Sequence, residues 1–185
     1  MSNVRQALDQ VIEEAVKLTP KGYFEVSHDP EWPSDCIIET QFDNDLWKPA
    51  PQLKPVDFSG LANALGAPIH KDIQDYYGSF WSGSLQGKTK EGPIDLIQLW
   101  NQEDFERLIA NLIGHMLEKQ RSKSPFTIFF ATTDPDSELF LSIENDTGRI
   151  LLEEPGKAPI KEVDTDIASF LKRITAVKHG KPGTN

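Results

Sequence analysis

Cysteine is almost absent from this chain, because Cys36 is the single one among 185 residues. A lone thiol cannot form an internal disulfide, so the disulfide-stapled folds of secreted proteins are excluded. A hydrophobic content of 38% lets one domain of this length bury a core without staples. We expect a single domain over residues 1–178 in a reducing cytoplasm, followed by a flexible tail at 179–185.

Long hydrophobic runs are also missing. The longest nearly uncharged runs, such as FTIFFAT, are far too short to cross a bilayer. The N-terminal stretch MSNVRQALDQVIEE lacks the apolar centre of a signal peptide. The sequence therefore predicts a soluble protein without a membrane-spanning segment.

Positive charge is scarce, since 19 Lys and Arg residues face 29 Asp and Glu residues and give a net charge of −10. No Lys or Arg lies between Gly22 and Trp47. That interval holds these acids: Glu25, Asp29, Glu31, Asp35, Glu39, Asp43 and Asp45. Such a field repels nucleic-acid phosphates and anionic lipids and attracts basic protein segments. We therefore expect a basic protein partner and no nucleic acid, although ordinary solubility charge would also explain the excess.

Patterns for catalysis and metal binding are weak. None of the four histidines stands in a metal-ligand arrangement such as H-E-x-x-H, so we expect no metal and no cofactor. We expect His115 to be satisfied by one hydrogen bond where a helix borders a sheet, rather than to act as a base. A nucleophilic pair of Cys36 with His70 or His115 stays open, although no family signature surrounds the cysteine.

The stretch GSLQGKT at 83–89 looks like a phosphate-binding loop. It has three residues between its glycines where that loop needs four, and a turn at Lys90–Pro93 follows it in place of a helix. We expect an exposed outer strand of a hairpin instead. Because Lys88 and Lys90 make this edge basic, an acidic partner-binding face should lie elsewhere.

The hydrophobic periodicity predicts an α+β fold with a mainly antiparallel sheet packed with helices. Helices are expected over 4–16, 59–65, 70–80 and 101–120, and a last one is capped by Asp164 or Thr165. Strands are expected over 84–88, 94–99, 126–132, 139–143 and 149–154, with a tight turn at 145–148. Residues 23–55 hold many prolines and should form an ordered loop with at most short strands at 36–38 and 46–47.

Two sets of apolar residues have specific roles in this prediction. The core face of the 101–120 helix is expected to consist of Phe105, Leu108, Ile109, Leu112, Ile113 and Met116. The four tryptophans, Trp32, Trp47, Trp81 and Trp100, lie near prolines, glycines or strand ends. They are expected to plug the edges of the core, and one that is exposed beside acids would anchor a basic partner.

Residues 96–132, LIQLWNQEDFERLIANLIGHMLEKQRSKSPFTIFFAT, resemble the same region of the bacterial Syd family, which interacts with SecY. The matching spacing is L-x-Q-x-W-x-x-x-D-F-x-R, then N-L-I-G-H, then R-x-K-x-P-x-T-x-F-x-A-T, and PSDCII and LWKPAP add a weaker match. The resemblance implies a SUKH-like fold and no catalytic activity. It also implies a regulatory or quality-control protein held peripherally at the cytoplasmic side of the inner membrane by SecY loops, with an acidic concave surface.

The candidate interface is the acidic interval from Glu25 to Asp45 together with Trp47, Asp72 and Asp75. Cytosolic loops of membrane proteins carry excess Lys and Arg, so this charge fits the partner that the resemblance implies. Two alternatives remain: a SUKH-type, immunity-like module for another basic protein, and a small hydrolase or nucleotide-binding enzyme.

Overall fold

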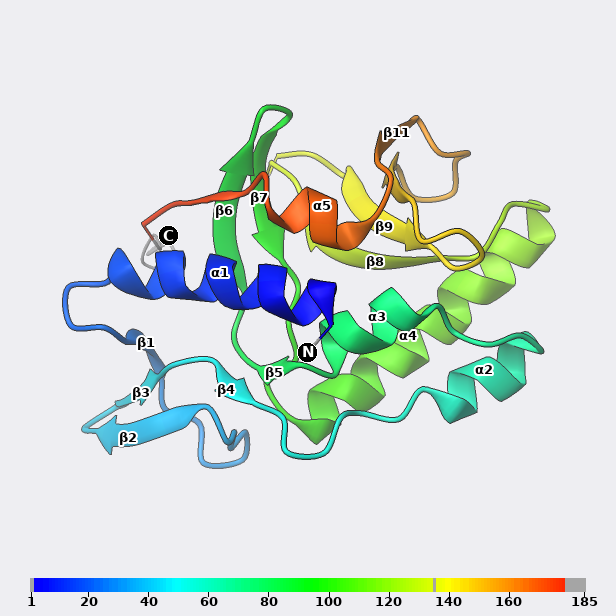
Figure 1. Ribbon diagram of the computed structural model, residues 1–185. Helices are drawn as coiled ribbons and strands as arrows, with labels where there is room; N and C mark the ends of the chain where they lie inside the picture. The colour runs from blue at the N-terminus through cyan, green and yellow to red at the C-terminus, as the bar shows by residue number, and fades with distance from the viewer. Residues whose placement is uncertain (1, 135, 179–185) are drawn as a thin grey trace.

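A seven-stranded antiparallel sheet forms the centre of the computed structural model, which describes residues 2–134 and 136–178 (Figure 1). Its strands stand in the order β11-β10-β9-β8-β7-β6-β12. Their bounds are β6 Leu85–Thr89, β7 Gly92–Leu96, β8 Thr127–Thr132, β9 Phe140–Glu144, β10 Ile150–Glu153, β11 Lys161–Asp164 and β12 Thr175–Ala176. The predicted single α+β domain with an antiparallel sheet is confirmed, and the predicted tail at 179–185 lies outside the described residues.

The helices pack on the sheet through apolar stripes that the sequence reveals. Figure 1 shows α1 (Asn3–Lys17) and α5 (Ile167–Leu171) lying across the sheet, with α3 (Lys71–Tyr77) beside them. The long α4 (Gln102–Arg121) carries α2 (Ser59–Leu65) against its side. Asn101 caps α4 as expected, because its side chain accepts a 2.9 Å hydrogen bond from the Asp104 N–H. The Asp104 carboxylate accepts one of the same length from the Trp100 N–H.

A second, smaller sheet occupies the region expected to be mostly loop. It has the order β1-β3-β2, formed by Phe24–Ser27, Asn44–Trp47 and Ile37–Gln41 respectively. The strands at 36–38 and 46–47 were expected, but β1 was not, because only Phe24 of its four residues is buried and no alternating pattern marks it. A two-stranded pair of β4 (Ala50–Pro51) and β5 (Phe80–Trp81) follows.

The structure corrects the predicted end of one helix and the predicted cap of another, and it adds two short strands. The helix expected over 70–80 ends at Tyr77, because Gly78 terminates it and Phe80 begins β5. The last helix is capped by Asp166, whose carboxylate accepts from the Ser169 N–H at 2.8 Å, rather than by Asp164 or Thr165. Strands β11 and β12 were not expected, because one is only half buried and the other has two residues.

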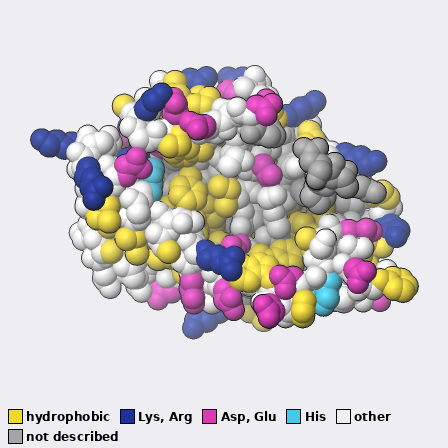
Figure 2. Space-filling view, turned by 180° about the vertical axis from the view of Figure 1, so that it is seen from behind, with side chains coloured by type: hydrophobic (Ala, Val, Ile, Leu, Met, Phe, Trp, Pro, Cys, Tyr) yellow, Lys and Arg dark blue, Asp and Glu magenta, His cyan; other side chains and the backbone are white. Residues whose placement is uncertain are grey.

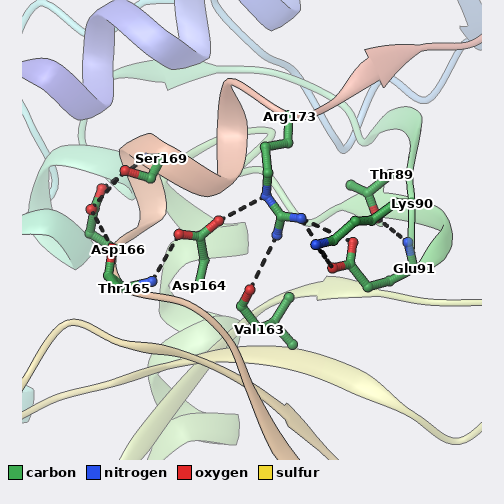
Figure 3. A network of polar contacts seen from close by, with 9 residues as sticks. All are labelled: Thr89, Lys90, Glu91, Val163, Asp164, Thr165, Asp166, Ser169 and Arg173. Carbon is green, nitrogen blue, oxygen red and sulfur yellow. Dashed lines mark hydrogen bonds and ion pairs between the residues drawn. The ribbon is translucent and has the colours of Figure 1, made fainter.

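Arg173, which follows α5, connects edge strand β11 of the large sheet to the β6–β7 turn. Its guanidinium reaches Glu91 in the β6–β7 turn at 3.0 Å and Asp164 at the end of β11 at 2.8 Å (Figure 3). It also donates to the Val163 carbonyl. Asp164 is therefore a partner of Arg173, and these ion pairs connect β11 to the β6–β7 turn.

Helix α4 carries a buried charged residue that its sequence pattern does not reveal. Lys119 is buried and pairs with the buried carboxylate of Glu153 on β10, which also accepts a hydrogen bond from Ser142. Burial acts to raise the pKa of Glu153, but the hydrogen bonds from Lys119 and Ser142 lower it below its ordinary value. Ile113, predicted to face the core, is exposed, because α4 turns that side to solvent.

Removing the cation of this pair should be costly. Lys119→Met leaves the Glu153 carboxylate buried without its counter-charge, and we expect a loss of about 3–5 kcal/mol in the free energy of unfolding. Lys119→Met/Glu153→Leu should recover much of that loss, because neither charge then remains. Urea denaturation measures both.

The control is Lys157→Met, which breaks the exposed Lys157–Glu154 pair and should cost less than about 1 kcal/mol. Equal losses in Lys119→Met and Lys157→Met would show that the buried ion pair stabilises the fold no more than the exposed one.

Candidate partner-binding cleft

A cleft of about 480 Å³ opens where the small sheet meets β6 and β7 of the large one. We call it the acidic cleft. Its lining consists of Glu25, Val26, Ser27, Asp29, Trp32, Asp45, Trp47, Gly83, Ser84, Gln86, Asp95 and Trp100. Four carboxylates and three indoles thus line it, and none of these described lining residues is Lys or Arg. Carboxylates beside aromatic rings suit Lys and Arg side chains, whose stems are apolar and whose ends are charged.

Stacked aromatic rings form one wall of the cleft. The Trp47 indole is buried, stacks on Phe24 with ring centroids 4.5 Å apart, and meets Trp100 edge-on at 5.5 Å. Trp100 donates from Nε1 to the Trp32 carbonyl at 2.9 Å. The Arg107 guanidinium lies 4.0 Å from the Trp32 ring centre. Trp47 is therefore a structural plug, as expected of the tryptophans in general, while Trp32 and Trp100 are partly exposed in the cleft.

Packing against Trp47 explains why glycine stands at position 83. A Cβ atom at this position would stand 2.7 Å from the Trp47 ring, so only glycine allows the indole to pack against the chain. Gly87 is constrained in the same way by Ile174, 2.5 Å from the corresponding point. The GSLQGKT stretch is a sheet strand, as expected. It is not an outer one, however, because β6 lies between β7 and β12.

The acidic cleft borders the first part of this stretch and leaves out its basic end at Lys88 and Lys90. Ser84 and Gln86 line the cleft together with the carboxylates of Glu25, Asp45 and Asp95. Lys88 lies farther along β6 and is not part of the lining.

Asp45 is the buried acid of the cleft, with a side chain only 3% exposed. One of its oxygens accepts from Thr40 at 2.6 Å and lies 2.9 Å from Nδ1 of His28. Burial acts to raise the pKa of Asp45, but these hydrogen bonds outweigh it and lower the pKa below its ordinary value. The Asp45 carboxylate therefore stays charged and contributes negative potential to the cleft while it holds the β2–β3 hairpin.

The other predicted interface residues fall into three places. Glu25 and Asp29 are exposed in the lining of the cleft. The exposed acids outside that lining are Glu31, Asp35, Glu39 and Asp43. Asp72 and Asp75 lie on α3, where Asp75 pairs with Lys71, and they line a separate cavity of about 400 Å³. The cleft thus brings together Glu25, Asp29, Asp45 and Trp47 of the predicted set.

Sequence reasoning missed Asp95 as part of this surface, whereas Trp32 and Trp100 are among the tryptophans expected to anchor a partner if exposed beside acids. Asp95 stands between the buried residues Ile94 and Leu96 on β7, so its alternation alone would have placed a carboxylate on the open face. Asp95 and Gln86 also line an adjoining hollow of about 510 Å³ that reaches Thr132 and Asp134. Figure 2 shows acidic and hydrophobic side chains gathered over the small sheet at the border of this hollowed face.

The candidate catalytic groups have structural environments. Cys36 is buried, and burial raises the pKa of its thiol to about 11, while Ser34 lies 3.1 Å from its sulfur. His115 lies 2.9 Å from the Thr127 hydroxyl and among Phe126, Phe129 and Phe140, as expected of a satisfied histidine at a helix–sheet border. Burial lowers the pKa of His115. A protonated buried thiol is a poor nucleophile.

Within residues 2–134 and 136–178, no cluster of three or more His, Cys, Asp or Glu side chains could hold a metal ion. No helix in this part of the chain is long and apolar enough to span a bilayer.

Replacing Asp45 should produce a pH-dependent loss of stability. Asp45→Asn weakens the hydrogen bonds from Thr40 and His28, and we expect a loss of about 1–3 kcal/mol at pH 7. A carboxylate with a lowered pKa stabilises the fold above the ordinary carboxyl range, and that contribution disappears as the pH falls below about 4. The difference from the wild type, measured by urea denaturation, should therefore shrink at pH 3. The exposed neighbour serves as control, because Asp43→Asn should change stability little at either pH.

A methyl group at Gly83 should disturb the aromatic wall. Gly83→Ala forces the Trp47 ring away, and we expect a loss of about 1–3 kcal/mol in thermal or urea unfolding. The matched control is Gly60→Ala, in α2, where an added Cβ meets no atom within 4 Å and should be neutral or slightly stabilising. Comparable stability of the two variants would contradict the tight packing of Trp47 on Gly83.

Comparison with known proteins gives the family of this chain. Residues 2–176 match the family described as Syd protein (SUKH-2). The chain is 36% identical over 170 residues to the Protein Syd of Alteromonas mediterranea, covering 91% of this chain and 93% of that relative. It is 36% identical over 153 residues to the Protein Syd of Pseudoalteromonas atlantica, covering 80% and 82%. Identity is 32% over 160 residues with that of Colwellia psychrerythraea, covering 81% and 80%. As its residues 96–132 suggested, the chain belongs to the Syd family.

Proposed function

We propose that this protein is a regulatory or quality-control factor that binds basic cytosolic loops of the SecY translocon in the acidic cleft. The observation that carries the proposal is the cleft itself, where Glu25, Asp29, Asp45 and Asp95 surround three tryptophans. Membership of the Syd family supports SecY as the partner. The protein acts by binding, without a cofactor, and it is not an enzyme.

The net negative charge of the protein bears on its location in the cell. Cytosolic loops of membrane proteins are rich in Lys and Arg, whereas the lipid surface beside them is anionic. A protein with a net charge of −10 is attracted to the loops and repelled by the lipid. It therefore associates peripherally with the cytoplasmic side of the inner membrane through SecY, beside a soluble cytoplasmic pool.

Capture of SecY-containing membranes by the tagged protein tests the proposal. Glu25→Lys/Asp29→Lys reverses two exposed acids of the cleft and should weaken capture by roughly tenfold or more. Glu39→Lys/Asp43→Lys makes the same change in net charge outside the lining and is the matched control. Asp45 is left intact in both variants, because its carboxylate holds the hairpin.

The outcomes separate the possible partners and surfaces. Wild-type capture should fall as salt is raised, because exposed charges are screened. Equal losses in the two variants would mean that net charge, rather than the cleft, attracts SecY. No capture of SecY membranes, with capture of another basic protein instead, would favour the immunity-like alternative.

A further inference from the structure

Strand β1 has a free edge that faces the acidic cleft. Among the described residues it lies at the end of the β1-β3-β2 sheet, where it pairs with β3. The His28 N–H donates to the Asp43 carbonyl at 2.8 Å, which fixes the phase of the antiparallel ladder. Because hydrogen-bonded pairs alternate along such a ladder, Val26 and Phe24 face β3, whereas Glu25 and Ser27 turn their N–H and C=O groups outward.

These outward groups are available to a ligand. Glu25 and Ser27 both line the acidic cleft. Within the described part of the chain, their backbone groups on this side form no hydrogen bond. A strand edge of this kind is a template for another extended chain, and proteins recognise peptides by adding them to such an edge.

We propose that the partner binds as an extended basic segment that adds a strand to the free edge of β1. The inference rests on the proposed function and specifies how the same cleft recognises its ligand. The added segment exchanges main-chain hydrogen bonds with Glu25 and Ser27. With four residues at about 3.3 Å each, β1 offers an edge of roughly 13 Å.

The side chains around this edge select a basic segment over other strands. Glu25 stands on the edge strand itself, and Asp29 lies just beyond its end. Side chains of an added strand alternate in direction, so Lys or Arg residues on it reach these carboxylates. The Trp100 ring in the lining accepts their apolar stems, whereas the Trp32 ring already carries the Arg107 guanidinium. Pairing of two copies of this chain through β1 would instead bring the Glu25 carboxylates together, which like-charge repulsion opposes.

Proline at Ser27 tests the main-chain contact. Ser27→Pro removes the outward N–H but no hydrogen bond to β3, so an edge strand tolerates it. We expect capture of SecY membranes to fall roughly tenfold. Ser27→Ala keeps the N–H and should capture like the wild type. Circular dichroism and the unfolding midpoint check that both variants fold.

A second experiment uses the wild-type protein, so it does not depend on how the proline variant folds. Synthetic peptides covering the cytosolic loops of SecY are titrated, and each backbone N–H of a binding peptide is then methylated in turn. Strand addition predicts an alternating pattern, in which methylation at every second residue weakens binding at least tenfold. Amide hydrogen exchange at Glu25 and Ser27 should slow on binding, because these groups become hydrogen-bonded.

The outcomes distinguish this inference from the function on which it rests. If the wild type captures SecY and Ser27→Pro captures it equally well, strand addition is wrong while the proposed function stands. A methylation profile without alternation likewise overturns strand addition and leaves the proposed function standing. If Ser27→Pro changes only self-association, measured by sedimentation, the edge belongs to a second copy and the inference fails. Absence of wild-type capture would instead overturn the proposed function.

Discussion

The packing of one indole holds the acidic cleft together. Trp47 stacks on Phe24, meets Trp100 edge-on and presses against the backbone of Gly83. These contacts join the small sheet to the start of α4 and to the strand that leads into the large sheet. The acidic cleft lies where the small sheet meets β6 and β7, and it brings Glu25 and Asp95 into one lining.

The acids of this cleft differ in burial and therefore in role. Asp45 is buried and fixed by Thr40 and His28, so it contributes a permanent charge without being available for a rearranging contact. Glu25 and Asp29 are exposed, as the proposed contact with a partner's cations requires. A scaffold that holds one charge and exposes others gives a negative field of fixed shape, which favours association rate and orientation over raw affinity.

Much of the scaffold followed from local patterns. The apolar stripes of α1 and α4, the Asn101 cap and the strands at β8, β9 and β10 lie where their periodicity predicts. Features that depend on distant partners did not. Lys119 looked like a surface lysine until Glu153 on β10 provided its counter-charge, and Arg173 gained its role only when Glu91 and Asp164 met it. Strand β1 has little apolar signal of its own and forms because Phe24 packs on Trp47.

The sequence by itself determined the fold class, the family resemblance in residues 96–132 and the acidic, Lys- and Arg-free interval before Trp47. Composition and periodicity are local properties that can be counted along the chain. Tertiary structure alone decided which acids share a surface: it joined Glu25 and Asp29 to Asp95, left Glu39 and Asp43 outside the lining, and placed Ser84 and Gln86 beside them. The reason is physical, since this cleft is lined by segments that meet only through contacts between residues far apart in the chain, such as Trp47 on Gly83.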